Sequence, residues 1–112
     1  MASDDFCYLT TTGRRSGTPH RIEIWYGSTP PTIYLMSGGR DGSDWVQNLQ
    51  ADPAVLVEID GVIRSGVARV LDGDEAARAR TIVFDKYAPR YDSDLVEWRE
   101  RALPIAIDLR EP

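Results

Sequence analysis

The chain is divided into short segments of β type, and the turns between them limit the folds that it can adopt. Segments 54–59 and 62–71 are rich in branched aliphatic residues and are joined by an Asp-Gly pair, which is typical of tight β-hairpins. Segments 6–12 and 21–26 flank a polar connection with two glycines and predict a second hairpin. Strands joined by hairpins pair antiparallel, so a doubly wound parallel sheet does not fit this pattern.

Two more strands and three helices complete the predicted order. Segment 32–36 is a strand after a Pro-Pro pair, and segment 103–109 is a final strand with a proline near its start, where strand pairing tolerates it. Helical spacing predicts helices over 44–49, after 72 and over about 94–101. Capping boxes are expected at the start of the first two helices, formed by Asp44 with Gln47 and by Asp72 with Glu75.

These elements predict a protein of the α+β class. About six strands, mostly antiparallel, form a small barrel, and two to three helices pack against its outside. The 112 residues contain no linker rich in Pro, Gly or Ser, so residues 1–112 are expected to form a single domain.

Charge and composition argue against several classes of function. The 13 basic and 18 acidic residues give a net charge of −5, a poor match for nucleic acid or an anionic membrane. Cys7 is the only cysteine and His20 the only histidine, so we expect neither a disulfide scaffold nor a metal site, and we place Cys7 in the core. No signal peptide and no apolar run of membrane-spanning length are visible, which predicts a cytoplasmic protein without a membrane anchor.

The densest polar segment covers 13–21, at the turn of the first predicted hairpin. It holds three arginines, a serine and two glycines. Glycines let backbone N–H groups approach an anion closely, and Arg side chains bind phosphate or carboxylate oxygens through paired donors. The segment therefore suits a phosphate or polycarboxylate ligand, and a solvated basic hairpin tip without a ligand is the alternative. It is not a Walker loop, because no helix follows it.

A second candidate segment runs over 36–45, from a strand end through a glycine-rich loop into a helix. Free N–H groups at a helix start favour anionic or electron-rich ligand atoms. An ordinary connection with Trp45 in the core is the alternative.

Taken together, the two segments resemble the two motifs of the deazaflavin-dependent nitroreductase family. Segment 9–21 resembles the first motif, and Ser37-Gly38-Gly39 with the following 44–53 resembles the second. The resemblance extends from residue 8 to residue 109. It implies a split β-barrel related to flavin-binding reductases of the pyridoxamine-phosphate-oxidase type. It also implies the coenzyme F-420, a deazaflavin that carries a hydride and bears a phosphate and an oligoglutamate tail.

The resemblance also implies roles for individual residues. The phosphate region is assigned to Arg14, Arg15, Ser16 and Gly17, with His20 in a place where relatives commonly carry Arg and Arg21 able to supply that charge. The ring side is assigned to Met36, Ser37, Gly38 and Gly39, closed by Asp44, Trp45 and Asn48. The chain departs from the family pattern where Arg15 replaces a lysine and Ser43-Asp44-Trp45 replaces Pro-x-Trp. It also lacks a long N-terminal extension, which suggests a short, soluble side branch.

The expected reaction is the transfer of a hydride from reduced F-420 to an electron-poor small molecule, such as a quinone, an enone or a nitro compound. Solvent, or the phenol of Tyr26, Tyr87 or Tyr91, would protonate the product. The two tyrosines near the end of the long helix are equally well interpreted as packing residues. Three alternatives stay open: an FMN- or haem-binding barrel, a non-catalytic deazaflavin carrier, and a dimeric interaction module with a relict site. The sequence leaves monomer and homodimer both open.

Overall fold

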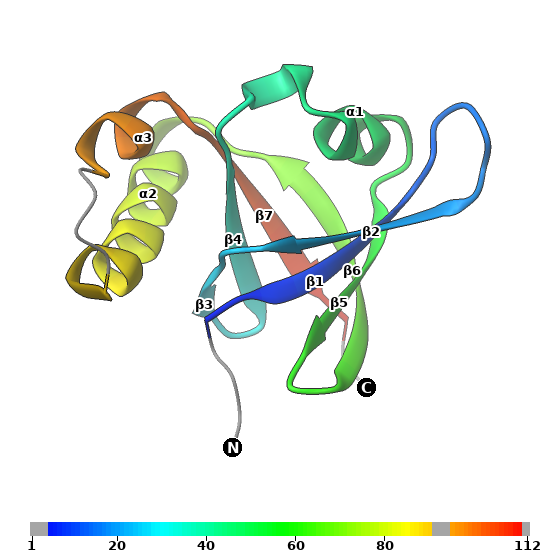
Figure 1. Ribbon diagram of the computed structural model, residues 1–112, viewed down its shortest axis with the longest axis horizontal. Coiled ribbons are helices and arrows are strands. Elements are labelled where there is room, and N and C mark those ends of the chain that lie inside the picture. Colours follow the sequence, from blue (N-terminus) through cyan, green and yellow to red (C-terminus); the bar gives the residue numbers. More distant parts are fainter. Residues whose placement is uncertain (1–4, 91–94, 111–112) are drawn as a thin grey trace.

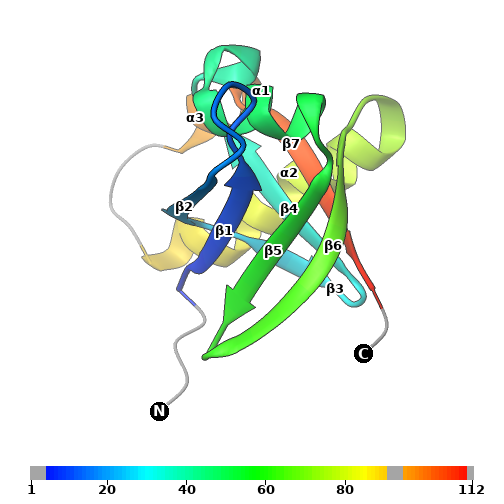
Figure 2. The same cartoon turned by 90° about the vertical axis from the view of Figure 1, so that its right-hand side faces the viewer.

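A computed structural model describes residues 5–90 and 95–110, whose strands form a single antiparallel sheet. The strand order is β2-β1-β5-β6-β7-β4-β3, and the sheet curls into a half-barrel (Figure 1, Figure 2). The strands are β1 (Cys7–Thr12), β2 (Pro19–Ile24), β3 (Gly27–Thr29), β4 (Thr32–Ser37), β5 (Ala54–Ile59), β6 (Val62–Val70) and β7 (Leu103–Leu109). The helices are α1 (Asp44–Ala51), α2 (Gly73–Tyr87) and α3 (Val96–Arg101), with short 3-10 turns η1 (Arg40–Gly42) and η2 (Ala88–Arg90).

Strand β6 connects the two halves of the sheet. Its first residues pair with β5 and its last residues pair with β7. Gly66 of β6 lies close against β7, where a Cβ atom would be 2.7 Å from Cγ2 of Ile107 and 2.9 Å from the carbonyl oxygen of Asp108. At the other end of the hairpin, Asp60 and Gly61 both have positive φ, as the predicted tight turn requires.

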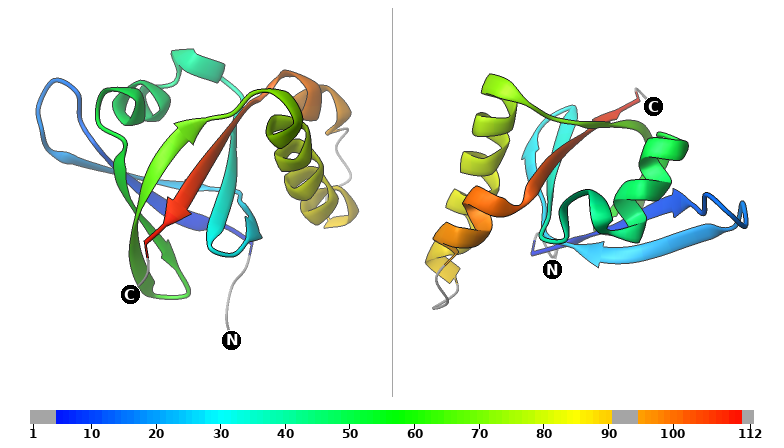
Figure 3. Two further views of the ribbon diagram at one scale, coloured as in Figure 1. Left: turned by 180° about the vertical axis from the view of Figure 1, so that it is seen from behind. Right: turned by 90° about the horizontal axis from the view of Figure 1, so that it is seen from above.

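The two faces of the curled sheet carry two hydrophobic cores. The inner core fills the half-barrel, and α1 closes one end of it with Val46 and Leu49. The outer core lies between α2 and the strands β4 and β7, where Ala79, Val83 and Tyr87 have no exposed surface. Figure 3 shows α1 and α2 on different sides of the sheet. Strands β4 and β7 are therefore buried on both faces, which explains their nearly unbroken apolar sequences.

The predicted α+β barrel and its antiparallel hairpins are confirmed, with one strand more than expected. The prediction of one strand over 21–26 is wrong in its boundaries. β2 already starts at Pro19, which pairs with Thr12 of β1, and it ends at Ile24. The additional strand, β3, pairs Gly27 with Tyr34 and is only three residues long. A strand of three residues is too short to show an alternation of apolar and polar residues in the sequence.

The helices differ from the predictions at their first turns. Neither predicted capping box forms, because no side chain caps α1 or α2. At α1, the residue before the helix is Ser43, and the Gln47 side chain donates to carbonyl oxygens of the η1 turn rather than to the helix start. At α2, the Glu75 carboxylate accepts from Arg69 rather than from the backbone at the helix start. The third helix starts at Val96, and the part of its predicted range before residue 95 lies outside the described residues. Of the helices in the described ranges, none is both long and apolar enough to cross a membrane.

Candidate functional site

The turn between β1 and β2 is a compact loop held by its own backbone. The Gly13 N–H donates to the carbonyl oxygen of Thr18, and the Gly17 N–H donates to that of Gly13, both at 2.8 Å. Gly17 has a φ of 73°, a left-handed conformation that favours glycine. The Ser16 hydroxyl lies 2.7 Å from that of Thr18 and accepts the Thr18 N–H. The loop therefore presents its arginines from a fixed backbone.

Asn48 of α1 connects this loop to the helix. The Asn48 side chain is 4% exposed, and its Oδ1 accepts the backbone N–H of Arg14 at 3.2 Å and Nη1 of Arg14 at 2.8 Å. Its Nδ2 donates to the hydroxyl of Thr11, which is also buried. Nη2 of Arg14 forms an ion pair with Asp44 at 3.2 Å. The two motifs, which are about 30 residues apart in the sequence, thus meet at one buried amide that is hydrogen-bonded through both its oxygen and its nitrogen.

A pocket of about 270 Å³ lies between the loop and the start of α1. We call it the polar pocket; it is lined by Gly13, Arg14, Arg15, Ser16, His20, Asp44 and Asn48. A Cβ atom on Gly13 would lie 2.5 Å from Nε2 of His20 and 2.7 Å from Oγ of Ser16, so only glycine leaves this space open. Within the described part of the chain, Arg15 has no hydrogen bond or ion pair. Its guanidinium is therefore available to an anion.

Arg21 does not belong to this pocket. Neighbouring residues of a strand point to opposite faces, so Arg21 lies on the other face from His20. Its guanidinium stacks on the ring of Tyr8, 3.8 Å from the centroid, and forms an ion pair with Glu58 at 3.2 Å. Arg21 is therefore not among the residues that line the polar pocket, although the resemblance assigns its charge to the phosphate region.

The end of β4 leads into the second motif. β3 pairs with β4 only as far as Tyr34, and so the remaining residues of β4 have no strand partner on that side among the described residues. Ser37 is buried, donates to the carbonyl oxygen of Arg40 at 2.9 Å and lies 2.8 Å from the Ser43 hydroxyl. Gly38 and Gly39 are exposed. This edge offers backbone groups, and not the Ser37 side chain, to a ligand.

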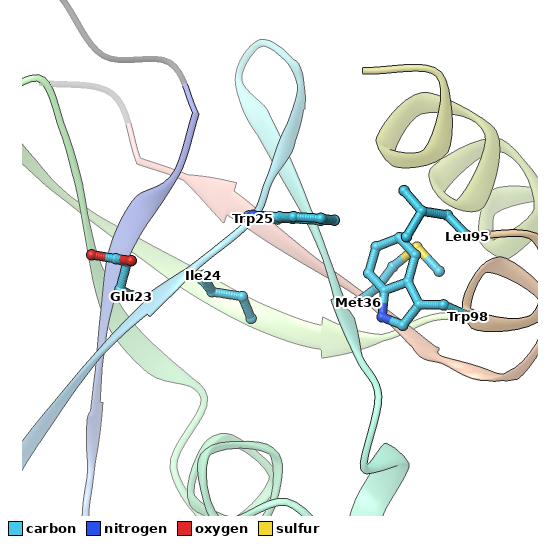
Figure 4. A pocket seen from close by; sticks show the side chains of 6 residues that line it. All are labelled: Glu23, Ile24, Trp25, Met36, Leu95 and Trp98. Carbon is cyan, nitrogen blue, oxygen red and sulfur yellow. The ribbon is translucent and has the colours of Figure 1, made fainter. Parts of the chain in front are cut away.

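A second pocket, of about 450 Å³, lies beside this edge (Figure 4). We call it the aromatic pocket; it is lined by Glu23, Ile24, Trp25, Met36, Leu95 and Trp98. The ring of Trp25 stacks on that of Tyr87 with centroids 4.2 Å apart, and the ring of Trp98 stands at 82° to that of Trp25. Figure 4 shows Glu23 turned away from the two tryptophans. The cavity next to the glycine edge is therefore aromatic and apolar.

Sequence reasoning placed Met36 in the site but missed Trp25, Leu95 and Trp98. Trp25 directly follows β2, and the sequence pattern made it part of the predicted strand. Trp98 belongs to α3, which is far from β2 in the sequence. Trp45, which the resemblance assigns to the ring side, is partly buried against the inner core. An unusual density of tryptophan, three in 112 residues, was the one available signal.

Two of the three candidate phenols, those of Tyr26 and Tyr87, belong to buried residues. The Tyr87 hydroxyl accepts the N–H of Tyr26 at 3.0 Å and donates to the carbonyl oxygen of Asp5 at 2.6 Å. Burial raises the pKa of the Tyr87 phenol well above its ordinary value. Tyr26 is 6% exposed, and Tyr91 lies outside the described residues. As predicted, Cys7 is buried, and burial raises the pKa of its thiol to about 12.

The polar and aromatic pockets lie along the same strand. His20, in β2, lines the polar pocket, and Ile24, at the end of β2, lines the aromatic pocket. They are four positions apart in extended chain, a span of about 13 Å. Both side chains point to the same face because their positions differ by an even number. One ligand with an anionic end and a flat ring can reach both pockets.

Solved structures place this fold among split β-barrels. A putative pyridoxamine 5′-phosphate oxidase from Listeria innocua matches with a TM-score of 0.69 and 16% identity over 96% of this chain and 85% of that one. An F420-H2 dependent reductase (FDR-A) matches with a TM-score of 0.74 and 19% identity over 92% and 93%. A protein solved as a domain-swapped dimer matches with a TM-score of 0.76 and 20% identity over 92% and 79%. The chain thus has the split β-barrel fold of these proteins.

The family model identifies the branch. The model of the F420H(2)-dependent quinone reductase family matches residues 1–110, and the chain belongs to this family. The protein is an F-420-dependent reductase, and F-420 is its cofactor.

The residues present fit this cofactor. An unpaired arginine, a serine hydroxyl and a space that a Cβ atom on Gly13 would fill suit a phosphate. The aromatic pocket and the neighbouring glycine edge suit a flat ring.

Proposed function

We propose that the protein transfers a hydride from reduced F-420 to a flat, electron-poor small molecule, such as a quinone, an enone or a nitro compound. One observation carries this proposal: an arginine-lined pocket and a tryptophan-lined pocket open along the same strand, next to an exposed glycine edge. An anion site alone would fit many ligands, and an aromatic pocket alone would fit many others. Their combination fits a coenzyme with an anionic tail together with a second, flat substrate.

At the polar pocket, the proposed ligands of the phosphate are Arg15, Ser16, Gly17 and His20. Arg15 is free to form bidentate bonds, and the glycines bring backbone N–H groups close to the anion. Arg14 and Asn48 are proposed to act structurally rather than as phosphate ligands, because they bind each other and hold the loop against α1. Asp44 balances the Arg14 charge, so that the net positive charge at the pocket comes chiefly from Arg15.

At the glycine edge, the backbone from Met36 to Gly39 is proposed to contact the coenzyme ring, with no side chain in the way at Gly38 and Gly39. When it is bound, the reduced coenzyme supplies the hydride. The side chains of Met36, Trp25 and Trp98 provide an apolar wall that positions a flat acceptor and excludes water from one side of it.

The proton that completes the reduction is proposed to come from water. Tyr26 and Tyr87 are buried, and the hydroxyl of Tyr87 is bonded to backbone groups. The aromatic pocket opens to solvent at its rim, where a water molecule can reach the product. No protein nucleophile is needed for this chemistry.

The test is a fluorescence titration of the purified protein with oxidised F-420, run beside FMN at the same salt concentration. It is followed by the oxidation of reduced F-420 with menadione, a neutral quinone, as the acceptor. We expect saturable binding of F-420, weaker binding of FMN and turnover of menadione. Tight binding without turnover of quinones, enones or nitro compounds would indicate a carrier and contradict the proposal.

A further inference from the structure

The proposed function leaves open which acceptors the aromatic pocket prefers, and a second group of arginines lies next to it. Arg40 in η1 and Arg80 in α2 both donate to the last turn of α3. Arg40 binds the carbonyl oxygen of Arg101, and Arg80 binds those of Arg99 and Glu100. Segments 40 residues apart thus bring two guanidinium groups to three successive carbonyl oxygens.

Neither of these arginines is neutralised by a carboxylate. Among residues 5–90 and 95–110, no Asp or Glu oxygen lies within 4.0 Å of the charged nitrogens of Arg40 or Arg80. The two neighbouring arginines are already occupied, since Arg101 pairs with Glu97 at 2.9 Å and Arg99 lies over the ring of Phe84. Partial burial and the charge of Arg40 both lower the pKa of Arg80. Two like charges are therefore held together, in a chain whose net charge is −5.

Most of their donors remain available. A guanidinium has five N–H donors, and Arg40 and Arg80 each use only Nη1 in the bonds described. Arg40 also has a φ of 55°, in the left-handed region that a non-glycine residue rarely adopts. The fold therefore keeps an arginine where glycine or asparagine would be less strained, which is frequent at binding sites.

The pair binds backbone groups one helical turn away from a residue of the aromatic pocket. Trp98 lines that pocket, and one turn of α3, about 5 Å, leads from it to Arg101, whose carbonyl oxygen binds Arg40. On the other side, Gly38 precedes Arg40 by two residues, and a Cβ atom there would be 3.8 Å from the Trp98 ring. This pair is separate from the polar pocket, which is lined from the β1–β2 loop and α1.

We propose that the Arg40–Arg80 pair binds an anionic group of the acceptor, so that the enzyme prefers flat, electron-poor acceptors that carry a carboxylate or a sulfonate. The inference rests on the proposed function for the location of the acceptor. An acceptor ring against Trp98 would place such a substituent towards the end of α3, where the two guanidinium groups bind it through paired N–H donors.

The experiment compares two acceptors that share a ring and differ in charge, 1,4-naphthoquinone and 1,4-naphthoquinone-2-sulfonate. The variants are Arg40→Asn, which tolerates the left-handed backbone, Arg80→Gln and the double variant. Arg78→Gln is the matched control, since Arg78 is an exposed arginine of the same helix. Steady-state rates with reduced F-420 are measured together with the quenching of tryptophan fluorescence by each quinone without coenzyme.

We expect the double variant to raise the KM for the sulfonate about tenfold, the loss that goes with one charge-assisted bond, with kcat nearly unchanged. The KM for the neutral quinone should stay within about twofold, and Arg78→Gln should match the wild type with both quinones. Equal effects on the two quinones, no effect on either, or an equal effect of Arg78→Gln would overturn the proposal.

The quenching measurement separates this proposal from the proposed function. If neither quinone is reduced but the double variant still loses sulfonate binding selectively, the anion site stands and the reductase assignment to these acceptors fails. If both quinones are reduced and the variants do not discriminate between them, the reductase assignment stands and the anion site fails.

Discussion

At the scale of single residues, the two adjacent arginines of the first motif have different environments. Arg14 is 25% exposed and bonded to Asn48 and Asp44, whereas Arg15 is exposed and has no described partner. The sequence suggests that they are equivalent ligands of an anion. The structure indicates that one holds the loop and the other is free to bind.

We therefore expect Arg15→Ala and Arg14→Ala to separate binding from stability. Arg15→Ala should weaken F-420 binding at least tenfold, since a charged hydrogen bond contributes about 1.5–3 kcal/mol, and should change the free energy of unfolding by less than about 0.5 kcal/mol. Arg14→Ala should lower the free energy of unfolding by about 1 kcal/mol, because the bond to the buried Asn48 is lost. Urea unfolding and fluorescence titration of both variants measure the two effects. Wild-type affinity in Arg15→Ala would remove this residue from the site.

At the scale of elements, the packing of α2 against the β2–β3 connection positions the wall of the aromatic pocket. Tyr87, at the end of α2, stacks on Trp25 and accepts the backbone N–H of Tyr26. Lys86 adds a bond to the carbonyl oxygen of Tyr26 at 2.9 Å and lies over its ring. The end of a helix thus fixes a strand connection that has little regular structure of its own.

Removing one hydroxyl tests this connection. Tyr87→Phe keeps the ring stacked on Trp25 but leaves the buried N–H of Tyr26 without that acceptor, so the free energy of unfolding should fall by about 1–3 kcal/mol. Tyr34→Phe is the control, because the one hydrogen bond of the Tyr34 hydroxyl within the described residues is a long 3.5 Å contact with Glu75. Its loss should cost less than about 0.5 kcal/mol. Both values come from urea unfolding. Equal stabilities of the two variants would show that the Tyr87 hydroxyl does not hold the connection.

The elements also show what the sequence can predict. Hairpins were predictable, because an Asp-Gly turn and alternating apolar residues are local signals. The two glycine-containing loops over 13–21 and 36–45 could also be found, because their residues are close together in the sequence. The aromatic pocket was not predictable, because Trp25, Met36 and Trp98 meet only after α3 folds back onto the sheet. The prediction of a capping box at the start of α2 was wrong because Glu75 pairs with Arg69. Arg69 lies in β6, and the contact forms only once β6 and α2 pack together.

At the scale of the whole molecule, one charged network joins three neighbouring strands of the sheet, β6, β7 and β4, to α2. Arg69 of β6 pairs with Asp108 of β7 and with Glu75 in the first turn of α2, each with a contact of 2.6 Å. Asp108 also accepts the Thr32 hydroxyl of β4 at 3.0 Å. Three strands and a helix therefore share one guanidinium and two carboxylates at the surface of the outer core.

This network makes the stability depend on pH in a defined direction. Hydrogen bonds from Arg69 lower the pKa values of Glu75 and Asp108 in the folded state. A carboxyl group with a depressed folded-state pKa stabilises the fold above its unfolded-state pKa, about 4, and this contribution is lost as the pH falls below that value. The wild type should thus melt at a higher temperature than Arg69→Gln at pH 7, and the difference should shrink towards pH 3. Calorimetric melts of both proteins at these two pH values measure the difference in melting temperature. Arg64→Gln is the control, because Arg64 lies in the same strand and has no carboxylate partner in the described chain. A difference that stays constant down to pH 3 would show that these two carboxylates do not carry the acid sensitivity of the fold, because protonation would then leave the contribution of Arg69 intact.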